Sequence, residues 1–249
     1  MILNFFKYKA KYDKSSFLNK QNVSFIKFGL DRTKGKNLYN NLIIKHSFLN
    51  TPMSSEHNII FCSLKFSKLN INNILEIGTY NGINAFLLSE IFPNSLIDTY
   101  DLPDNTLEFT STYNRSDAKF LKKFISDRTK LLSSKVNIVF HQINSIYLTF
   151  KQDKIYDLIW IDGSHSYPVV SIDIMNSLRL INKNGVILCD DIILDSNNYN
   201  QYSSRASFET LSLLKDAGII DFKLFYKRLS VDDNSIPNRR KFVAYIIKL

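Results

Sequence analysis

Three aspartates follow two of the predicted strands and could act together. Asp162 comes directly after the apolar run 156–161, and Asp190 and Asp191 come directly after the run 186–189. The two strands are expected to be neighbours, so the carboxylates would converge, and each close pair repels by about 4 kcal/mol at 4 Å in an effective dielectric of 20. A hard cation with oxygen ligands would relieve this repulsion. The same residues could instead cap a turn and a loop, because successive side chains of a strand face opposite ways.

A histidine follows the first of these aspartates closely. His165 ends the loop Asp-Gly-Ser-His that begins at Asp162. A neutral imidazole here could take the proton of a substrate hydroxyl or contact the substrate, and it could equally be a loop histidine bonded to backbone. The other histidines show no partner pattern and are expected to be structural or exposed: His46, His57 and His141.

A glycine turn gives the second group of chemically informative residues. The stretch Ile74–Gly82 predicts a short buried strand, then a turn with Gly78 and Gly82, before a helix over 83–91. Gly78 lets the backbone leave the strand in a conformation that a Cβ penalises, and Gly82 would let a ligand sit against the helix start. Glu76 lies inside the strand, so it needs partners. We expect these to be backbone N–H groups of the glycine loop.

The spacing of the glycines bears on the ligand. A dinucleotide site has the pattern G-x-G-x-x-G, whereas here Tyr80 stands at the position of the middle glycine and would crowd a pyrophosphate. A ligand without phosphate fits better. Asp101 ends the second predicted strand roughly 20 residues after Gly78, which is the spacing of an acid that binds ribose hydroxyls.

The elements that must position these residues alternate along the chain. Strands are predicted at 72–77, 96–100, 136–141, 156–161, 186–189, 222–226 and 242–247, and helices at 55–66, 82–92, 116–132, 145–151, 168–180 and 205–217. Ser54 or Ser55 is expected to cap the first helix, and Asn184-Gly185 to turn the chain into the fifth strand. Helical spacing predicts that the helix over 168–180 buries Val169, Ile172, Met175 and Leu178.

This alternation predicts an α/β fold with a mostly parallel, seven-stranded sheet and helices on both faces. About fifteen mostly polar residues join the last two strands, which is too few for a crossover helix. We therefore expect the sheet to end in an antiparallel hairpin.

Several stretches of the sequence resemble one enzyme family. Glu76-x-Gly78-x-x-x-Gly82 resembles motif I of class I S-adenosylmethionine (SAM)-dependent methyltransferases. The runs Tyr-Asp-Leu-Ile-Trp-Ile-Asp-Gly-Ser-His-Ser-Tyr at 156–167 and Asn-Gly-Val-Ile-Leu-Cys-Asp-Asp at 184–191 resemble its metal-dependent sugar and small-molecule O-methyltransferase branch, of the macrocin O-methyltransferase-like, methyltransferase domain 24 type. The resemblance covers residues 54–248 and implies the Rossmann-like class I fold. Asn184 departs from the branch pattern by replacing a glycine, and Asn144 by replacing an acid.

The resemblance implies a SAM-dependent O-methyltransferase that acts on a hydroxyl of a sugar or another small molecule. It implies that Asp162, Asp190 and Asp191 hold Mg²⁺, which would lower the pKa of the reacting hydroxyl. His165 and Asp162 would then be the catalytic residues. The implied cofactor-binding residues are Glu76, Gly78, Thr79, Tyr80, Gly82, Asp101, Asn144, Ser145 and Asp162.

Charge is distributed unevenly along the chain. Residues 1–50 carry ten basic side chains against two aspartates, which is nearly the whole formal net charge of +9, with aromatic residues between them. This segment could contact an anionic partner such as nucleic acid, lipid headgroups or a phosphorylated substrate, or it could be a lysine-rich packing arm. We favour the packing arm and expect 1–50 to be a basic N-terminal arm before a methyltransferase domain at 51–249. We expect this arm to be irregular, with one or two short helices. A homo-oligomer is also compatible with the sequence.

Other functions are weighed against this interpretation. RNA methylation would use the basic arm, but the chain lacks an Asn-Pro-Pro-Tyr type motif and a catalytic cysteine in a fitting loop. A non-catalytic nucleotide-binding Rossmann-like module is disfavoured by the intact aspartates, and an NAD-dependent oxidoreductase by Tyr80 and the terminal hairpin. No apolar run approaches the roughly 18 residues of a membrane span. Lysines interrupt the N-terminus, and Cys62 and Cys189 are expected to be buried reduced thiols, so we expect a cytoplasmic protein.

Overall fold

The sheet of this protein has seven strands in the order β3-β2-β1-β4-β5-β7-β6. The computed structural model describes residues 13–50, 56–151, 153–194, 204–229 and 240–249. The strands are β1 Asn73–Ile77, β2 Leu96–Asp101, β3 Ile138–Gln142, β4 Tyr156–Ile161, β5 Ile181–Ile192, β6 Ile220–Tyr226 and β7 Phe242–Lys248. β1 to β5 pair in parallel, and β7 is antiparallel to both β5 and β6. The predicted fold class and the terminal hairpin are confirmed.

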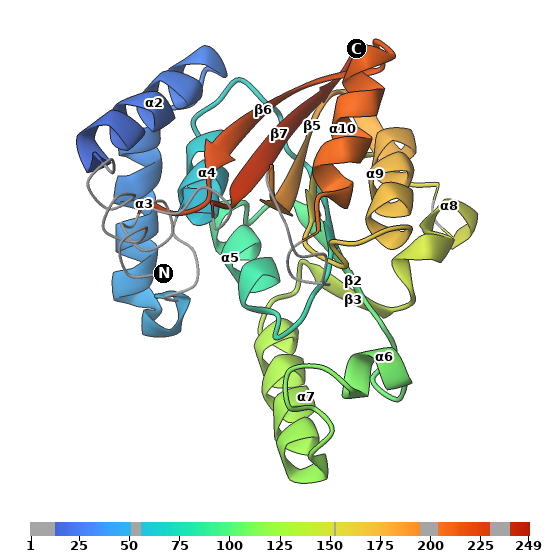
Figure 1. Cartoon of the computed structure of the whole chain (residues 1–249). Coiled ribbons are helices and arrows are strands. Elements are labelled where there is room, and N and C mark those ends of the chain that lie inside the picture. Colours follow the sequence, from blue (N-terminus) through green and yellow to red (C-terminus); the bar gives the residue numbers. More distant parts are fainter. Residues whose placement is uncertain (1–12, 51–55, 152, 195–203, 230–239) are drawn as a thin grey trace, which may run out of the picture.

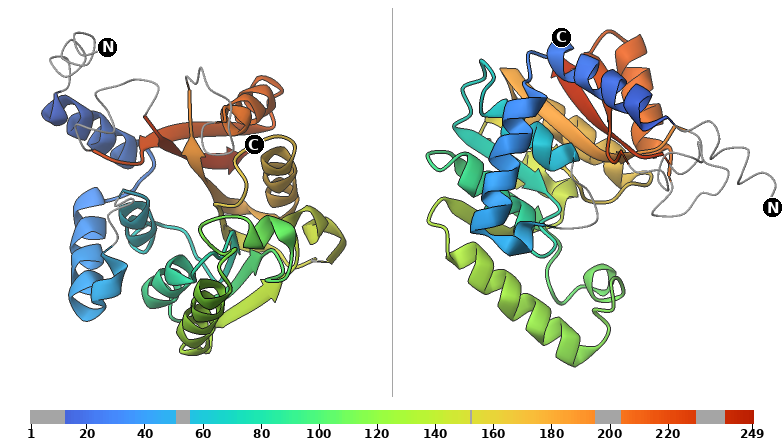
Figure 2. Two further views of the ribbon diagram at one scale, coloured as in Figure 1. Left: turned by 60° about the horizontal axis from the view of Figure 1, so that its bottom comes forward. Right: turned by 90° about the vertical axis from the view of Figure 1, so that its left-hand side faces the viewer.

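Helices cover both faces of this sheet (Figure 1). They are α2 Lys14–Lys27, α3 Arg32–Lys45, α4 Glu56–Leu64, α5 Ile83–Ile91, α6 Leu107–Thr110, α7 Ala118–Ser133, α8 Leu148–Lys151, α9 Val169–Leu180 and α10 Ala206–Asp216, with 3-10 turns η1 Ser47–Leu49 and η2 Ser145–Tyr147. Figure 2 shows the blue and teal helices α2 to α5 on one side of the sheet and the gold and orange helices α9 and α10 on the other. Among the described residues, every helix falls short of the length and apolar character needed to cross a membrane.

Each face of the sheet has its own hydrophobic core. β4 shows why, because Leu158 and Trp160 pack with α4 and α5 on one side, while Ile159 and Ile161 pack with α9 and α10 on the other. A central parallel strand that is buried on both faces reads as a continuous apolar run rather than as an alternating one. For this reason the predicted bounds of β4, 156–161, are correct.

The first described part of the chain is more regular than expected. We expected residues 1–50 to be irregular with short helices, but α2 and α3 have 14 residues each. Their N-caps are Asp13 and Asp31, which accept hydrogen bonds from Ser15 N and Lys34 N at 2.9 Å. These caps satisfy backbone donors that a helix start otherwise leaves free. The expected cap of α4 at Ser54 or Ser55 lies outside the described residues.

Buried contacts fix these two helices to the rest of the molecule. Phe25 of α2 packs edge-on against Phe225 of β6, with ring centroids 5.0 Å apart. Gln21 bonds both the N–H and the carbonyl of Tyr226, at 2.9 and 3.0 Å, so it pairs part of the exposed edge of β6. Glu56 of α4 accepts two hydrogen bonds from Arg32, at 3.0 and 2.5 Å. The described part of the basic segment is therefore packed against the sheet, with lysines on its outer surface.

Two local expectations were wrong. Asn184-Gly185 lies inside β5, which begins at Ile181, and the register with β4 shifts between Tyr156 and Leu158. The buried stripe of α9 contains Val170, Asp173, Ile174, Ser177 and Leu178, whereas Met175 is exposed. Hydrophobic spacing missed this stripe because two of its members are polar.

Candidate active site

The carboxyl ends of several strands meet at one edge of the sheet. β1, β2, β4 and β5 are parallel there, and β6 points the same way because both β5 and β6 are antiparallel to β7. The start of β7 lies at the same edge. Open α/β sheets bind ligands at this edge, so the polar residues that follow these strands form the candidate site.

The glycine turn after β1 is held between the ends of β2 and β4. Gly78 has φ +99° and donates its N–H to the carbonyl of Tyr100 at 2.8 Å. A Cβ at Gly78 would lie 2.2 Å from the carbonyl oxygen of Asp162, so only glycine fits at this contact. The predicted need for glycine is correct. The reason is contact with the backbone that follows β4, in addition to any ligand.

Tyr80 stands where a dinucleotide site would have its middle glycine. Its φ is +48°, a left-handed conformation that non-glycine residues rarely adopt, and its side chain is exposed. The ring lies beside those of Tyr113 and Phe124, with centroids 5.1 and 5.3 Å away, and the guanidinium of Arg115 lies 5.8 Å from it. An aromatic and cationic surface therefore borders the turn.

Asp101 fixes this turn to the end of β2. Its Oδ2 accepts from Tyr80 N at 2.7 Å and its Oδ1 accepts from Leu102 N at 2.8 Å. Burial raises the pKa of this carboxyl, against the lowering effect of these bonds and of Arg128 and Arg115. Each oxygen has a lone pair left, so Asp101 can still accept from a ribose hydroxyl.

The partners of Glu76 differ from those expected. The side chain is fully buried, and it accepts from Asn84 Nδ2 at 2.7 Å and from Thr99 Oγ1 at 2.5 Å, instead of from backbone N–H groups of the loop. Burial raises the pKa of Glu76 to about 7. Thr79 belongs to the same internal network, because its hydroxyl lies 2.6 Å from that of Thr99. The side chains of both predicted cofactor residues therefore point into the protein.

Three other predicted cofactor residues have internal roles. A Cβ at Gly82 would lie 2.8 Å from Leu132 Cδ2, so this glycine makes room for α7 rather than for a ligand. Asn144 caps η2 by accepting from Ile146 N at 3.1 Å. The Ser145 hydroxyl lowers the pKa of Asp173, but burial outweighs this effect and raises that pKa to about 7. Among the described residues, neither carboxyl oxygen of Asp173 has a hydrogen-bond partner of normal geometry.

A bulge at the end of β5 turns Asp190 and Asp191 toward the same group. Asp191 has φ +52°, and the pairing of β5 with β7 shifts register between Cys189 and Ile192. Successive strand side chains normally face opposite ways, and the bulge removes this alternation. The two carboxylates can therefore contribute to one site, although they are consecutive in the sequence.

Two lysines contact these carboxylates. Lys227, the residue after β6, donates from Nζ to Asp190 Oδ2 at 2.5 Å and also to Asp191 Oδ1. Lys241, just before β7, donates to Asp191 Oδ2. The exposed fraction of the side chain is 8% for Lys227 and 2% for Asp190. Burial lowers the pKa of Lys227, but the two aspartates outweigh it and hold the ammonium charged.

Asp162 and His165 lie on the open side of this cluster. His165 Nε2 is 3.6 Å from Asp162 Oδ1 and 3.9 Å from Asp191 Oδ2. The Asp162 side chain is 37% exposed, although protein atoms crowd its carboxyl group, and that burial with the charge of Asp190 raises its pKa well above the ordinary value. Burial lowers the pKa of His165. A neutral imidazole thus stands within reach of two carboxyl groups.

The predicted magnesium site is not formed by this arrangement. No group of three or more His, Cys, Asp or Glu side chains among the described residues is placed to hold a metal ion. Asp190 and Asp191 contact lysine ammonium groups where a shared cation would lie. The three predicted ligands are brought together as a cluster, but their charges are balanced from within the chain.

The sequence interpretation missed Lys227 and Lys241, whereas His57 is structural, one of the two roles expected for it. His57 of α4 stacks on Trp160 with ring centroids 5.3 Å apart, and burial lowers its pKa to about 4, against the charge of Asp190. The lysines could have been found, because an antiparallel last strand places the residues after β6 and before β7 at the ligand edge. Both cysteines are buried and free, as predicted.

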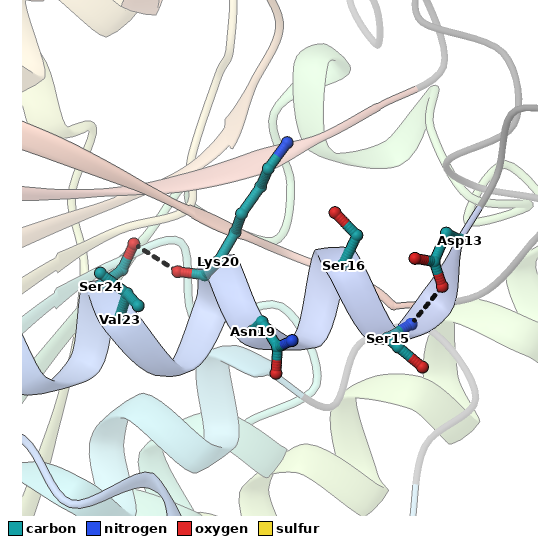
Figure 3. Close-up of a pocket in the computed structure, with 7 residues that line it drawn as sticks. All are labelled: Asp13, Ser15, Ser16, Asn19, Lys20, Val23 and Ser24. Carbon is teal, nitrogen blue, oxygen red and sulfur yellow. Dashed lines mark hydrogen bonds between the residues drawn. The ribbon is translucent and has the colours of Figure 1, made fainter.

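An open groove lies elsewhere, along α2. Its volume is about 550 Å³, and its described lining is Asp13, Ser15, Ser16, Asn19, Lys20, Val23 and Ser24 (Figure 3). All of these side chains come from one helix and its cap, and none belongs to the carboxylate cluster. We assign no chemistry to this groove.

The chain is similar to known methyltransferases. Residues 75–192 match the sequence model of a family described as "Methyltransferase domain". The O-methyltransferase TomG from Streptomyces achromogenes, described as involved in tomaymycin synthesis and solved with SAM, has TM-score 0.57 and 11% identity, covering 91% of this chain and 95% of that chain. The methyltransferase PaMTH1 of Podospora anserina, solved with SAH, has TM-score 0.54 and 16% identity, covering 88% of this chain and 87% of that chain. At these identities the likeness shows the fold alone.

A curated relative matches over a shorter stretch. The tRNA1(Val) (adenine(37)-N6)-methyltransferase of Pedobacter heparinus is 34% identical over 87 residues, which is 35% of this chain and 30% of that protein. The chain thus matches less than a third of the length of this relative.

Proposed function

We propose that this chain is a SAM-dependent methyltransferase that transfers a methyl group to a hydroxyl of a sugar or another small molecule, because residues 75–192 match a methyltransferase domain and the chain has the fold of such enzymes. The observation that carries the proposal is the pair of His165 and Asp162, with Nε2 and Oδ1 3.6 Å apart beside the glycine turn. An acceptor hydroxyl must lose a proton, and this pair offers a neutral imidazole with a carboxyl group next to it.

The residues around the turn fit SAM better than a dinucleotide. Asp101 offers acceptor lone pairs to ribose hydroxyls, which SAM carries. The Cβ of Tyr80 occupies the place through which a pyrophosphate would approach the backbone. Among the predicted cofactor residues, Gly78, Tyr80, Asp101 and Asp162 would line the bound SAM. Glu76, Thr79, Gly82, Asn144 and Ser145 would support them from within.

When bound, SAM would supply an electrophilic methyl group. As the acceptor oxygen bonds to the methyl carbon, the carbon–sulfur bond would break and its electron pair would stay with sulfur. His165 Nε2 would receive the hydroxyl proton. Asp191 and Asp162 then face the imidazolium from 3.9 and 3.6 Å, and the negative charge of Asp191 stabilises it. The rate of such an in-line displacement also depends on how well the chain aligns the acceptor.

The residues around Asp190 and Asp191 do not fit the predicted Mg²⁺ as they are arranged. Mg²⁺ requires near-octahedral oxygen ligands at 2.0–2.1 Å. Three of the four carboxylate oxygens of these two aspartates instead accept hydrogen bonds from Lys227 and Lys241.

RNA methylation is the second candidate. The local likeness to a tRNA methyltransferase and the basic side chains of residues 1–50 support it. Against it, β4 is followed by Asp-Gly-Ser-His instead of an Asn-Pro-Pro-Tyr type motif. RNA binding that weakens steeply with salt, together with methyl transfer to RNA, would favour this candidate over the first.

Calorimetric titration with S-adenosylhomocysteine tests the cofactor, and a panel of sugar and phenolic acceptors with SAM tests the reaction. His165→Gln should lower kcat by about 10²–10⁴-fold and leave S-adenosylhomocysteine affinity unchanged. His46→Gln is the matched control, since His46 ends α3 away from this edge. A folded chain that fails to bind S-adenosylhomocysteine would refute the proposed function, and an active His165→Gln variant would remove the base.

The partners and location of the protein also belong to this proposal. We propose a small-molecule or glycan acceptor and a cytoplasmic protein, supported by the two buried, free cysteines. A homo-oligomer, measurable by light scattering, is compatible with both.

A further inference from the structure

The mechanism given above assigns a role to Asp191 but none to Lys227, which pairs with Asp191 and with the buried Asp190. Lys227 reaches both aspartates at the end of β5, and its backbone N–H donates to the carbonyl of Lys241 at 3.0 Å, which continues the β6–β7 ladder. The lysine is therefore held by backbone pairing at the position where its side chain enters the cluster. Such a fixed ammonium differs from a surface lysine that adopts a contact by chance.

The ammonium lies where a cation shared by the two carboxylates would have to lie. Lys227 Nζ is 2.5 Å from Asp190 Oδ2 and also contacts Asp191 Oδ1. A magnesium ion shared by Asp190 and Asp191 would need to come within 2.0–2.1 Å of oxygens in the same small volume. The ion and the ammonium cannot occupy that volume together.

The charges of the ion-paired groups are already balanced. Lys227 and Lys241 carry two positive charges against the two carboxylates of Asp190 and Asp191. A divalent ion would leave this group with an excess of two positive charges in a place where Asp190 is 2% and Lys227 8% exposed. To admit the ion, Lys227 would have to leave the buried pair that it forms with Asp190.

We propose that Lys227 takes the place of a divalent cation in this site, so that methyl transfer by this chain needs no metal ion. Lys227 is then a positioning residue: it holds Asp190 and Asp191 together, and Asp191 in turn faces His165. This inference rests on the proposed methyl transfer for its functional part. Its structural part, the exclusion of a divalent ion, can be tested without any acceptor.

Binding of Mn²⁺ to the full chain, followed by electron paramagnetic resonance, is the direct test. The wild-type chain should bind no Mn²⁺ at this site. Lys227→Ala leaves the carboxylates facing one another without an ammonium between them and should gain one bound Mn²⁺ per chain. The double variant Lys227→Ala/Asp190→Asn should lose that ion again. Replacing a lysine that has only a structural role would not create a metal site, so this gain of Mn²⁺ binding is specific to the proposal.

The overturning result is a wild-type chain that binds one Mn²⁺ and loses it on Asp190→Asn. If Lys227→Ala fails to fold in a thermal melt, the wild-type measurement still decides, and Lys227→Met, which keeps the long side chain but carries no ammonium, replaces it. Turnover should be unchanged by EDTA, and turnover lost in EDTA and restored by Mg²⁺ would also overturn the proposal. Titration with S-adenosylhomocysteine keeps the two hypotheses apart, because its failure would refute methyl transfer and leave the Mn²⁺ result standing.

Discussion

Glu76→Gln should alter the pH dependence of stability in a way that can be calculated from the structure. The carboxyl group is fully buried in β1, with side-chain donors from Asn84 and Thr99. Gln keeps the shape, accepts from Asn84, and can donate to Thr99 Oγ1, whose own hydrogen can turn to Thr79. The variant should therefore fold, and the difference from wild type should lie in the titration of the carboxyl group.

Burial raises the pKa of Glu76 from 4.5 to about 7 in the folded protein. Between these pH values the folded state binds more protons than the unfolded state, so this residue's contribution to stability falls as pH rises. The loss begins near pH 4.5 and is complete above pH 7. A pKa difference of this size corresponds to about 3 kcal/mol.

Urea denaturation of both proteins between pH 4.5 and 8 measures this effect. The free energy of unfolding of wild type minus that of Glu76→Gln should fall by about 3 kcal/mol across the range, because other titrating groups cancel. Thr99→Val removes a donor that lowers the pKa of Glu76, so it should make the fall in stability larger. Parallel stability curves for wild type and Glu76→Gln would refute the reasoning.

Three further predictions test other contacts. Gly82→Ala, at φ +78° and against α7, should cost about 2–4 kcal/mol in urea denaturation, whereas Gly218→Ala, at φ +69° with no atom within 4 Å of the new Cβ, should cost only about 1 kcal/mol; equal costs would contradict the packing role of Gly82. Glu56→Gln should destabilise the protein by about 3 kcal/mol because a neutral amide leaves the charge of Arg32 without its ion-pair partner, and Arg32→Met in the same chain should recover part of the loss; additive losses would count against the pair. Asp101→Asn should weaken S-adenosylhomocysteine binding by about 1–3 kcal/mol in calorimetry, and an unchanged affinity would remove Asp101 from the cofactor site.

Local patterns in the sequence were enough to predict the class of fold. The apolar run of β4 gave its bounds, and the strand, glycine turn and helix from β1 to α5 were found within a residue or two. The short polar connection before β7 predicted the antiparallel ending. These features depend on residues close together in the chain, so spacing and turn chemistry reveal them.

Some features of the first 50 residues needed the tertiary structure. Lysines and asparagines gave α2 and α3 little amphipathic pattern, yet both helices form because Phe25 and Gln21 find partners on β6. These partners lie about 200 residues away in the chain. Helical stability in proteins comes mainly from such packing, which no local window contains.

The carboxylates of the site could be predicted from the sequence, but what faces them could not. Asp162, Asp190 and Asp191 were found because they follow strands. The two consecutive aspartates face one group because of a bulge with φ +52° at Asp191. That group is the ammonium of Lys227, which lies 37 residues away from Asp190 in the chain. Spacing along a strand fixes the face of the sheet to which a side chain points. Only the pairing of β5, β7 and β6 decides which charged group that side chain contacts, because the group comes from a strand that is distant in the sequence but near in the sheet.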